Sequence, residues 1–197
     1  MTIKRWLFVL ALCSLVSLAA CGEKPQGFHA TDISDAGFGK QFELVDHHGQ
    51  LRHLEDFRGK VTVMFFGFTH CPDVCPTTLA ELAAVLRKLG DAAQGVQVLF
   101  VTVDPERDTP EVLAGYVTAF NSDFIGLTGN LEQIAAVARE FKVAYQKAEG
   151  SEPGMYSVDH SAGTFIFDAQ GRLRLYVRYG QGSEAIASDI TRLLGEA

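Results

Sequence analysis

Residues 61–89 read VTVMFFGFTHCPDVCPTTLAELAAVLRKL, and they combine a strand, a loop with two cysteines and a helix. The first eight residues are apolar and rich in β-branched and aromatic side chains, which is typical of a buried central strand. Further along, leucines recur at intervals of three and four residues, which predicts an amphipathic helix. Pro76 suits the first turn of that helix. The sequence therefore places Cys71 and Cys75 where a buried strand passes into a helix.

The rest of the chain alternates strands and helices on both sides of this unit. In chain order the pattern predicts ββ-βα-βα-(β)α-ββ-α, an α/β order typical of a three-layer sandwich. The thioredoxin-like fold with an N-terminal β-hairpin is the expected architecture. The elements behind this prediction are a hairpin in FELVDHHGQLRHL (42–54), a buried strand VQVLFVTV (96–103), a helix start at Thr109-Pro110-Glu111, a helix at Leu131–Phe141, a hairpin formed by TFIFD (164–168) and RLRLYVRY (172–179), and a last helix capped by Ser183.

The N-terminal region is typical of an exported, lipid-anchored protein. Two basic residues, Lys4 and Arg5, precede an apolar stretch that ends near Ala20. This stretch is shorter than the roughly 20 residues that a membrane-spanning helix needs, so it favours a signal peptide. The sequence LAAC at 18–21 resembles a bacterial lipobox, which implies cleavage before Cys21 and a lipid on that residue. An ordinary signal peptide cut nearby is the alternative.

These features divide the chain into three parts. We expect a signal peptide at 1–20, a lipidated cysteine with a flexible tether at 21–40, and one folded domain at 41–197. The domain is long enough to bury a core without disulfide bonds. A composition of 47% hydrophobic and 21% charged residues excludes a disordered chain, and a formal net charge of −7 argues against nucleic-acid binding.

Cys71 and Cys75 form the one close cysteine pair of the expected domain, so they do not make a disulfide framework. Near a helix N-terminus the dipole favours a thiolate, the form that binds a metal or attacks a disulfide. Their spacing of four residues brings the sulfurs to one helical face. Two sulfurs with an imidazole suit copper, whereas zinc would need a fourth ligand. The alternative is a structural disulfide, although a five-residue loop gains little from one.

The chain has six histidines that could complete such a site, and His160 is the favoured one. It lies just before the strand TFIFD, in a loop that faces the first strand–helix junction in a thioredoxin-like sheet. Asp159 could hold the imidazole in orientation. The other histidines are expected in the tether (His29), in a polar turn (His47 and His48), in the first hairpin (His53), or pointing away from its cysteine neighbour (His70).

Three motifs together resemble the Sco (Sco/SenC) family of copper-delivery proteins: GFTHCPDVCP at 67–76, VTVDPERDTPEV at 101–112 and DHS at 159–161. The resemblance covers roughly residues 40–195. It implies a thioredoxin-like fold at the membrane and one copper, Cu(I) or Cu(II), bound by Cys71, Cys75 and His160. It also implies a role in assembling cytochrome c oxidase copper centres. We expect the DPERDTPE stretch to be a strand end, a loop and a helix cap, without a ligand role.

The expected function is therefore that of a copper metallochaperone, not an enzyme. Its expected place is the periplasm, lipid-anchored to a bacterial membrane, with the inner membrane favoured. Expected partners are the copper-site subunit of cytochrome c oxidase and a periplasmic copper chaperone or thioredoxin-like reductant, without nucleic acid.

Two other classes of function use the same cysteines. A thiol–disulfide oxidoreductase would reduce the cysteines of the oxidase copper site and form a redox disulfide between Cys71 and Cys75, and the same pair could sense redox state. The residues directly before TFIFD, Asp159 to Gly163, contain no proline, and Pro153 is too far upstream, which argues against a conventional thioredoxin. A peroxiredoxin-like peroxidase is disfavoured because Pro72 stands where that family has Thr or Ser.

Overall fold

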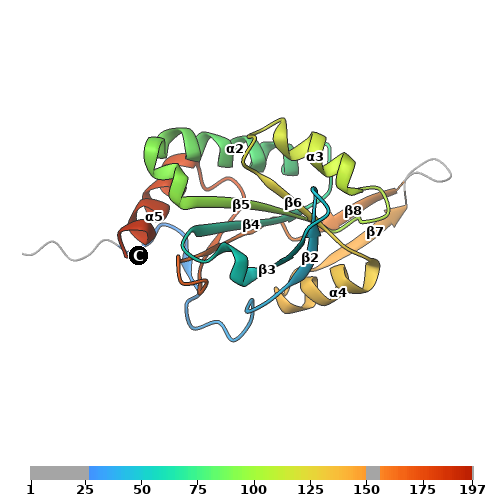
Figure 1. The fold of residues 1–197 in the computed structure, drawn as a ribbon, viewed down its shortest axis with the longest axis horizontal. Coiled ribbons are helices and arrows are strands. Elements are labelled where there is room, and N and C mark those ends of the chain that lie inside the picture. The colour runs from blue at the N-terminus through green and yellow to red at the C-terminus, as the bar shows by residue number, and fades with distance from the viewer. Residues whose placement is uncertain (1–26, 150–155, 197) are drawn as a thin grey trace, which may run out of the picture.

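The computed structural model describes residues 27–149 and 156–196, which form a mixed sheet with helices on both faces (Figure 1). The main sheet has eight strands in the order β1-β10-β9-β4-β5-β6-β2-β3, and β7 and β8 form a separate pair. The strands are β1 (Thr31–Asp32), β2 (Glu43–Asp46), β3 (Leu51–His53), β4 (Val61–Gly67), β5 (Val96–Thr102), β6 (Ile125–Thr128), β7 (Tyr145–Glu149), β8 (Tyr156–His160), β9 (Thr164–Phe167) and β10 (Leu173–Val177). The α-helices are α2 (Val74–Leu89), α3 (Pro110–Thr118), α4 (Leu131–Glu140) and α5 (Ser183–Gly195), and Leu54–Phe57 and Gly90–Gly95 are 3-10 helices.

The central strands are β4 and β5, which run parallel to each other. Every residue of β4 is buried, as its apolar run predicts for a strand covered on both faces. Their register pairs Gly67 with Thr102, so both strands end at the same edge of the sheet. The loop with the two cysteines and the loop after β5 therefore leave the sheet side by side.

Helices cover both faces of the sheet, which gives the three layers that the alternating pattern predicts. In Figure 1, α2 and α3 run along one face and α4 lies on the other. On the first face, Phe65 packs against Phe100, and Phe100 packs against Tyr116 of α3. On the second face, Phe66 contacts Phe141, which directly follows α4. The α/β sandwich with a thioredoxin-like order is thus confirmed.

Both predicted hairpins are present. The first pairs β2 with β3 and joins the main sheet through β6, so it lies at one edge. The second pairs β9 with β10, with one register shift between Leu173 and Leu175. Two helix starts differ in detail. Helix α2 begins at Val74, ahead of its leucine pattern, and Gly182 rather than Ser183 is the N-cap of α5.

The pair β7–β8 was not predicted from the sequence. Its strands read YQKAE and YSVDH, and of these ten residues Val158 alone is buried. Such polar, half-exposed strands lack the alternation of apolar residues by which a strand is recognised. His160 consequently ends a strand, where the sequence predicted a loop.

The N-terminal segment from residue 27 onward packs against the domain, although residues 21–40 were predicted to form a flexible tether. Strand β1 pairs with β10 at the edge of the main sheet. The buried carboxylate of Asp189 in α5 accepts hydrogen bonds from the backbone N–H groups of His29 (2.9 Å) and Ala30 (2.8 Å). These contacts join segments about 160 residues apart, which local sequence patterns do not reveal.

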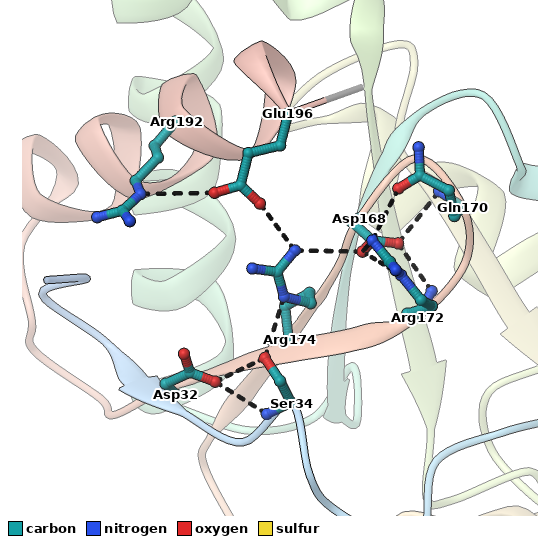
Figure 2. A network of polar contacts seen from close by, with 8 residues as sticks. All are labelled: Asp32, Ser34, Asp168, Gln170, Arg172, Arg174, Arg192 and Glu196. Atoms are coloured by element: carbon teal, nitrogen blue, oxygen red, sulfur yellow. Dashed lines mark hydrogen bonds and ion pairs between the residues drawn. The ribbon is translucent and has the colours of Figure 1, made fainter. Parts of the chain in front are cut away.

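A polar network continues this attachment along β10 (Figure 2). The guanidinium group of Arg174 donates to Ser34 Oγ (3.0 Å) and forms ion pairs with Glu196 (2.8 Å) and Asp168 (3.3 Å). The carboxylate of Asp168 is buried and also pairs with Arg172 (2.8 Å). The network thus ties the N-terminal segment to the last hairpin and the last helix.

The predicted signal peptide and the predicted lipid site at Cys21 lie outside the described residues. Within residues 27–149 and 156–196, none of the helices has the length and apolar character needed to cross a bilayer.

Candidate metal centre

The two cysteines lie on either side of the start of α2. Cys71 belongs to the loop after β4, where its N–H donates to the carbonyl oxygen of Phe68 (3.2 Å). Cys75 is the second residue of α2, and its N–H donates to the sulfur of Cys71 (3.4 Å). Both thiols are free, so the structural disulfide considered from the sequence is absent from this state.

His160 approaches the cysteines from the end of β8. Its Nε2 lies 3.3 Å from Cys75 Sγ, and its Nδ1 lies 2.9 Å from the carbonyl oxygen of Ser161. The rings of Phe65 and Phe68 contact the imidazole edge-on, with centroids 6.2 and 5.8 Å away. The ring is therefore held between two aromatic walls with one nitrogen directed at the sulfurs.

The ligand atoms of Cys71, Cys75 and His160 all lie within 4.8 Å of one another. In the part of the chain that the structure describes, this is the one cluster of at least three His, Cys, Asp or Glu residues with such convergence. Two sulfurs and one imidazole nitrogen are the donor set that soft and borderline transition metals prefer. The structure thus brings together the three residues that the sequence selected, and their arrangement can accept a metal ion.

The protonation of this site is governed by burial. Cys75 is completely buried, and burial raises the pKa of its thiol well above the usual range. In the metal-free protein, burial therefore opposes the Cys75 thiolate that the helix N-terminus was expected to favour, and a backbone hydrogen bond at Phe68 offsets only part of this effect. Burial also lowers the pKa of His160, against the opposing effects of the Ser161 carbonyl and the Asp159 charge. A lowered pKa favours the neutral imidazole, the form that binds metals, and a bound cation would compensate the buried thiolate.

The group that orients the His160 imidazole is the backbone carbonyl of Ser161 and not the predicted carboxylate of Asp159. Asp159 is exposed on β8 and acts on His160 through its charge, whereas the carbonyl oxygen of Ser161 makes the contact to Nδ1. The reason is the alternation of side chains along an extended strand, which directs adjacent residues to opposite sides. A backbone carbonyl fixes the tautomer as well as a carboxylate would.

The remaining histidines lie outside the cluster. His70 is exposed, and its Nδ1 lies 3.1 Å from Thr69 Oγ1. His47 is buried in the first hairpin, where its Nδ1 accepts from the N–H of Gly126 (2.9 Å). His48 lies beside His47, and the exposed His53 contacts Glu43.

Sequence reasoning missed the buried carboxylate of Asp108, which supports the cysteine loop. It accepts hydrogen bonds from Thr69 N–H (3.0 Å), from Thr69 Oγ1 (2.6 Å) and from Thr102 Oγ1 (2.6 Å). Thr69 lies two residues before Cys71, so Asp108 anchors the loop from which that ligand projects. No local pattern in DPERDTPE separates this buried aspartate from an exposed one.

Comparison with known proteins places the chain in a family. The SCO1/SenC family model matches residues 30–195. The mitochondrial SCO2 homolog of Bos taurus is 41% identical over 174 residues, which cover 87% of this chain and 65% of that protein, so the chain spans less than two thirds of that relative's length.

Two solved structures share the fold. ScoI of Bradyrhizobium japonicum, determined with copper bound, is 38% identical with a TM-score of 0.74, over 80% of this chain and 99% of that one. Apo Sco1 of Thermus thermophilus is 40% identical with a TM-score of 0.76, over 87% of this chain and 99% of that one. With the motif resemblance and the convergent Cys–Cys–His cluster, these matches show that the chain belongs to the SCO1/SenC family.

Proposed function

We propose that this protein binds one copper ion through Cys71, Cys75 and His160 and delivers it to a copper centre of cytochrome c oxidase. The observation that carries the proposal is the convergence of the three donor atoms within 4.8 Å. Two thiolates and an imidazole suit copper in both of its common oxidation states. The copper-bound relative from Bradyrhizobium japonicum supports copper as the cargo.

The unequal exposure of the ligands suits a delivery role. Cys75 is fully buried, whereas Cys71 is partly exposed. A receiving protein can therefore approach the cargo from the side of Cys71 and exchange that ligand first. His160 and Cys75 remain in place behind it, supported by the aromatic walls of Phe65 and Phe68. The protein supplies a held ion and an accessible first ligand, without a catalytic step of its own.

The binding test compares the reduced wild-type protein with three variants. One copper per chain is expected for the wild type by metal analysis, with absorption bands of sulfur ligation in the Cu(II) form. His160→Ala should weaken Cu(I) binding by about 100-fold or more, because even the partners that only orient ligands contribute roughly 10–100-fold. Cys75→Ser should weaken it at least as much. His70→Ala is the matched control, since this exposed histidine adjoins Cys71 outside the cluster.

Undiminished copper affinity in Cys75→Ser would refute the ligand assignment. Equal losses in His70→Ala and His160→Ala would show that the imidazole acts through something other than ligation. Delivery itself is tested by mixing the loaded protein with the copper-binding domain of an oxidase subunit and following the metal by its spectrum.

Reduction of a target disulfide is the second candidate function, and the free, adjacent thiols favour it. In that reaction the thiolate of Cys71 would attack the target disulfide, which forms a mixed disulfide and releases the first target thiol. Cys75 would then attack the Cys71 sulfur of the mixed disulfide and release the second target thiol. The products are a Cys71–Cys75 disulfide in this protein and two thiols in the target. A thioredoxin-like reductant would have to restore the dithiol. Oxidase assembly that fails in Cys→Ser strains supplied with abundant copper, but proceeds in a His160→Ala strain, would favour this function over delivery.

We also propose that a lipid on Cys21 holds the protein at the periplasmic face of a bacterial inner membrane. The support is the lipobox-like LAAC and the short apolar stretch before it. An oxidase in the inner membrane would then lie within reach of the domain. Mass spectrometry of the protein from membranes should show a chain that begins at a lipidated Cys21, and Cys21→Ser should release the protein into the soluble fraction.

A further inference from the structure

The loop between β5 and α3, residues 103–109, contacts both halves of the candidate metal centre. Its Asp108 holds the loop that carries Cys71, through Thr69. Its Arg107 contacts Tyr156, the first residue of the strand that ends at His160. One short loop thus joins the segment that supplies the sulfurs to the segment that supplies the imidazole.

The contact with β8 is a closed set of three side chains. Arg107 Nη1 donates to the carbonyl oxygen of Tyr156 (3.0 Å), and the guanidinium carbon lies 3.7 Å from the centroid of the Tyr156 ring. The Nε of Arg107 pairs with the buried carboxylate of Asp104. The hydroxyl of Tyr156 donates to that same carboxylate (2.7 Å). Stacking, an ion pair and two hydrogen bonds therefore fix the start of β8 against the loop.

The planar shape of Arg107 matters as much as its charge. Its guanidinium carbon lies 5.8 Å from the centroid of Phe68, and the Phe68 ring contacts His160 edge-on. Its Nη2 is buried and has no hydrogen-bond partner in the described part of the chain. A partly buried guanidinium group that leaves one nitrogen without a hydrogen bond is held in part by the aromatic faces on which it lies. Arg107 thereby links Tyr156 with the aromatic wall beside the imidazole.

Strand β8 benefits from such support because, among the described residues, it has no backbone pairing with the main sheet. Its partner is β7, and the two form a separate pair. Both cysteines, in contrast, project from a segment anchored on the central strand β4. The separation between His160 Nε2 and Cys75 Sγ is therefore set by the short connection from His160 to β9, which pairs with β4, together with side-chain contacts that hold β8 in place.

We propose that Arg107 is a positioning residue of the metal centre: it clamps β8 through Tyr156 and Asp104 so that the His160 imidazole stays directed at the cysteine sulfurs. The inference rests on the proposed copper binding by Cys71, Cys75 and His160. Arg107 acts through His160 and does not touch the ion.

A double-mutant cycle with His160 tests this role. The Cu(I) dissociation constant is measured by competition with a chromophoric chelator for the wild type, Arg107→Ala, His160→Ala and the double variant. Arg107→Ala should weaken binding by about 10-fold or more in the wild-type background, within the range for residues that orient a ligand. In the His160→Ala background the same change should alter the constant by less than about twofold, because the residue acts through that imidazole.

Arg174→Ala is the matched control. Like Arg107, Arg174 is partly buried, pairs with carboxylates and has an aromatic contact, in this case with Phe28. It belongs, however, to the network at β10, away from the candidate metal centre. The Arg174→Ala substitution should lower the melting temperature and leave the Cu(I) dissociation constant unchanged. Hydrogen–deuterium exchange of the metal-free proteins gives an independent readout: the β8 amides should exchange faster in Arg107→Ala and at the wild-type rate in Arg174→Ala.

The outcomes distinguish failure of the clamp, which Arg107 forms with Tyr156 and Asp104, from failure of the proposed copper binding. Wild-type copper affinity in folded Arg107→Ala, or an equal loss in both backgrounds of the cycle, would overturn the positioning role. If Arg107→Ala does not fold, Arg107→Lys keeps the charge beside Asp104 but lacks the planar face. Copper affinity of Arg107→Lys equal to that of the wild type would then refute the clamp. If the wild type itself bound no copper, the proposed function would fail, while the exchange of the β8 amides would still test the clamp.

Discussion

Gly67, the last residue of β4, allows the cysteine sulfur to lie against the sheet, and its replacement by alanine is an informative perturbation. A Cβ at this position would lie 2.7 Å from Cys75 Sγ and 2.8 Å from Phe100 Cε2. Heavy atoms in favourable contact are about 3.5–4.0 Å apart. Gly67→Ala therefore requires the sulfur and the Phe100 ring each to move away from the added methyl group by about 1 Å.

The magnitude follows from the crowding. Overpacking of a well-filled core costs about 1–3 kcal/mol of unfolding free energy. Restriction of the unfolded chain by alanine offsets about 0.5–1 kcal/mol of this cost. We expect a net loss of up to about 2.5 kcal/mol, which lowers the melting temperature by up to about 10 °C in a domain of this size. Displacement of the sulfur should also weaken Cu(I) binding, because Cys75 Sγ contacts His160 Nε2 at 3.3 Å.

The assays are thermal or urea unfolding of the metal-free protein and chelator competition for Cu(I). Gly115→Ala is the control, because an added Cβ there meets nothing within 4 Å and the position lies in α3. That variant should gain about 0.5–1 kcal/mol and bind copper normally. Gly67→Ala that is as stable as the wild type and binds Cu(I) equally well would refute the crowding at Cys75.

Three further substitutions test other parts of the structure. Asp108→Ala should lower the unfolding free energy measured in urea by about 3 kcal/mol, because Thr69 N–H loses its charged acceptor. Asp189→Ala should release the N-terminal segment, seen as faster proteolysis near residue 30, because two backbone amides lose their acceptor. For Asp168, burial acts to raise the pKa, but hydrogen bonds from Arg172 and Arg174 outweigh it and the pKa is lowered. Its contribution to stability is thus fully present above the unfolded-state pKa of about 3.9 and is lost as the pH falls through the folded-state value. Asp168→Asn should therefore lower stability at pH 7 and flatten its decline below about pH 4, measured by urea unfolding as a function of pH.

Each of these predictions has a result that contradicts it. Unchanged stability of Asp108→Ala would mean that Thr69 finds another acceptor. Wild-type proteolysis of Asp189→Ala would show that β1 holds the segment without the carboxylate. An acid-unfolding curve of Asp168→Asn that runs parallel to that of the wild type would place the acid dependence in other carboxyl groups.

The central elements were predictable because their sequence patterns are local. The apolar run of β4, the leucine spacing of α2 and the alternation in the last hairpin each report burial over a few consecutive residues. The pair β7–β8 was missed because nearly all of its residues are exposed or half-buried and carry no such pattern. The docking of β1 was missed for another reason, since its partners β10 and α5 lie far along the chain.

The candidate metal centre likewise combines features that the sequence predicted with features that it did not. The candidate ligands Cys71, Cys75 and His160 could be selected from spacing, donor chemistry and family resemblance. The helix start at Cys75 favours a thiolate, whereas burial raises the pKa of that thiol, and burial is a property of the packed chain. The partner of His160 Nδ1 was misplaced by two residues, from Asp159 to the carbonyl of Ser161.

The amino-acid sequence alone thus predicted the order of the central strands and helices and selected the candidate donor atoms, because periodicity and residue chemistry are properties of short segments. Tertiary structure decided the distance between sulfur and imidazole, the burial that sets their protonation, and the link from Arg107 to β8. The sulfur–imidazole distance and the Arg107 link depend on residues separated by 85 and 49 positions, and their geometry exists only once the chain has packed around one core.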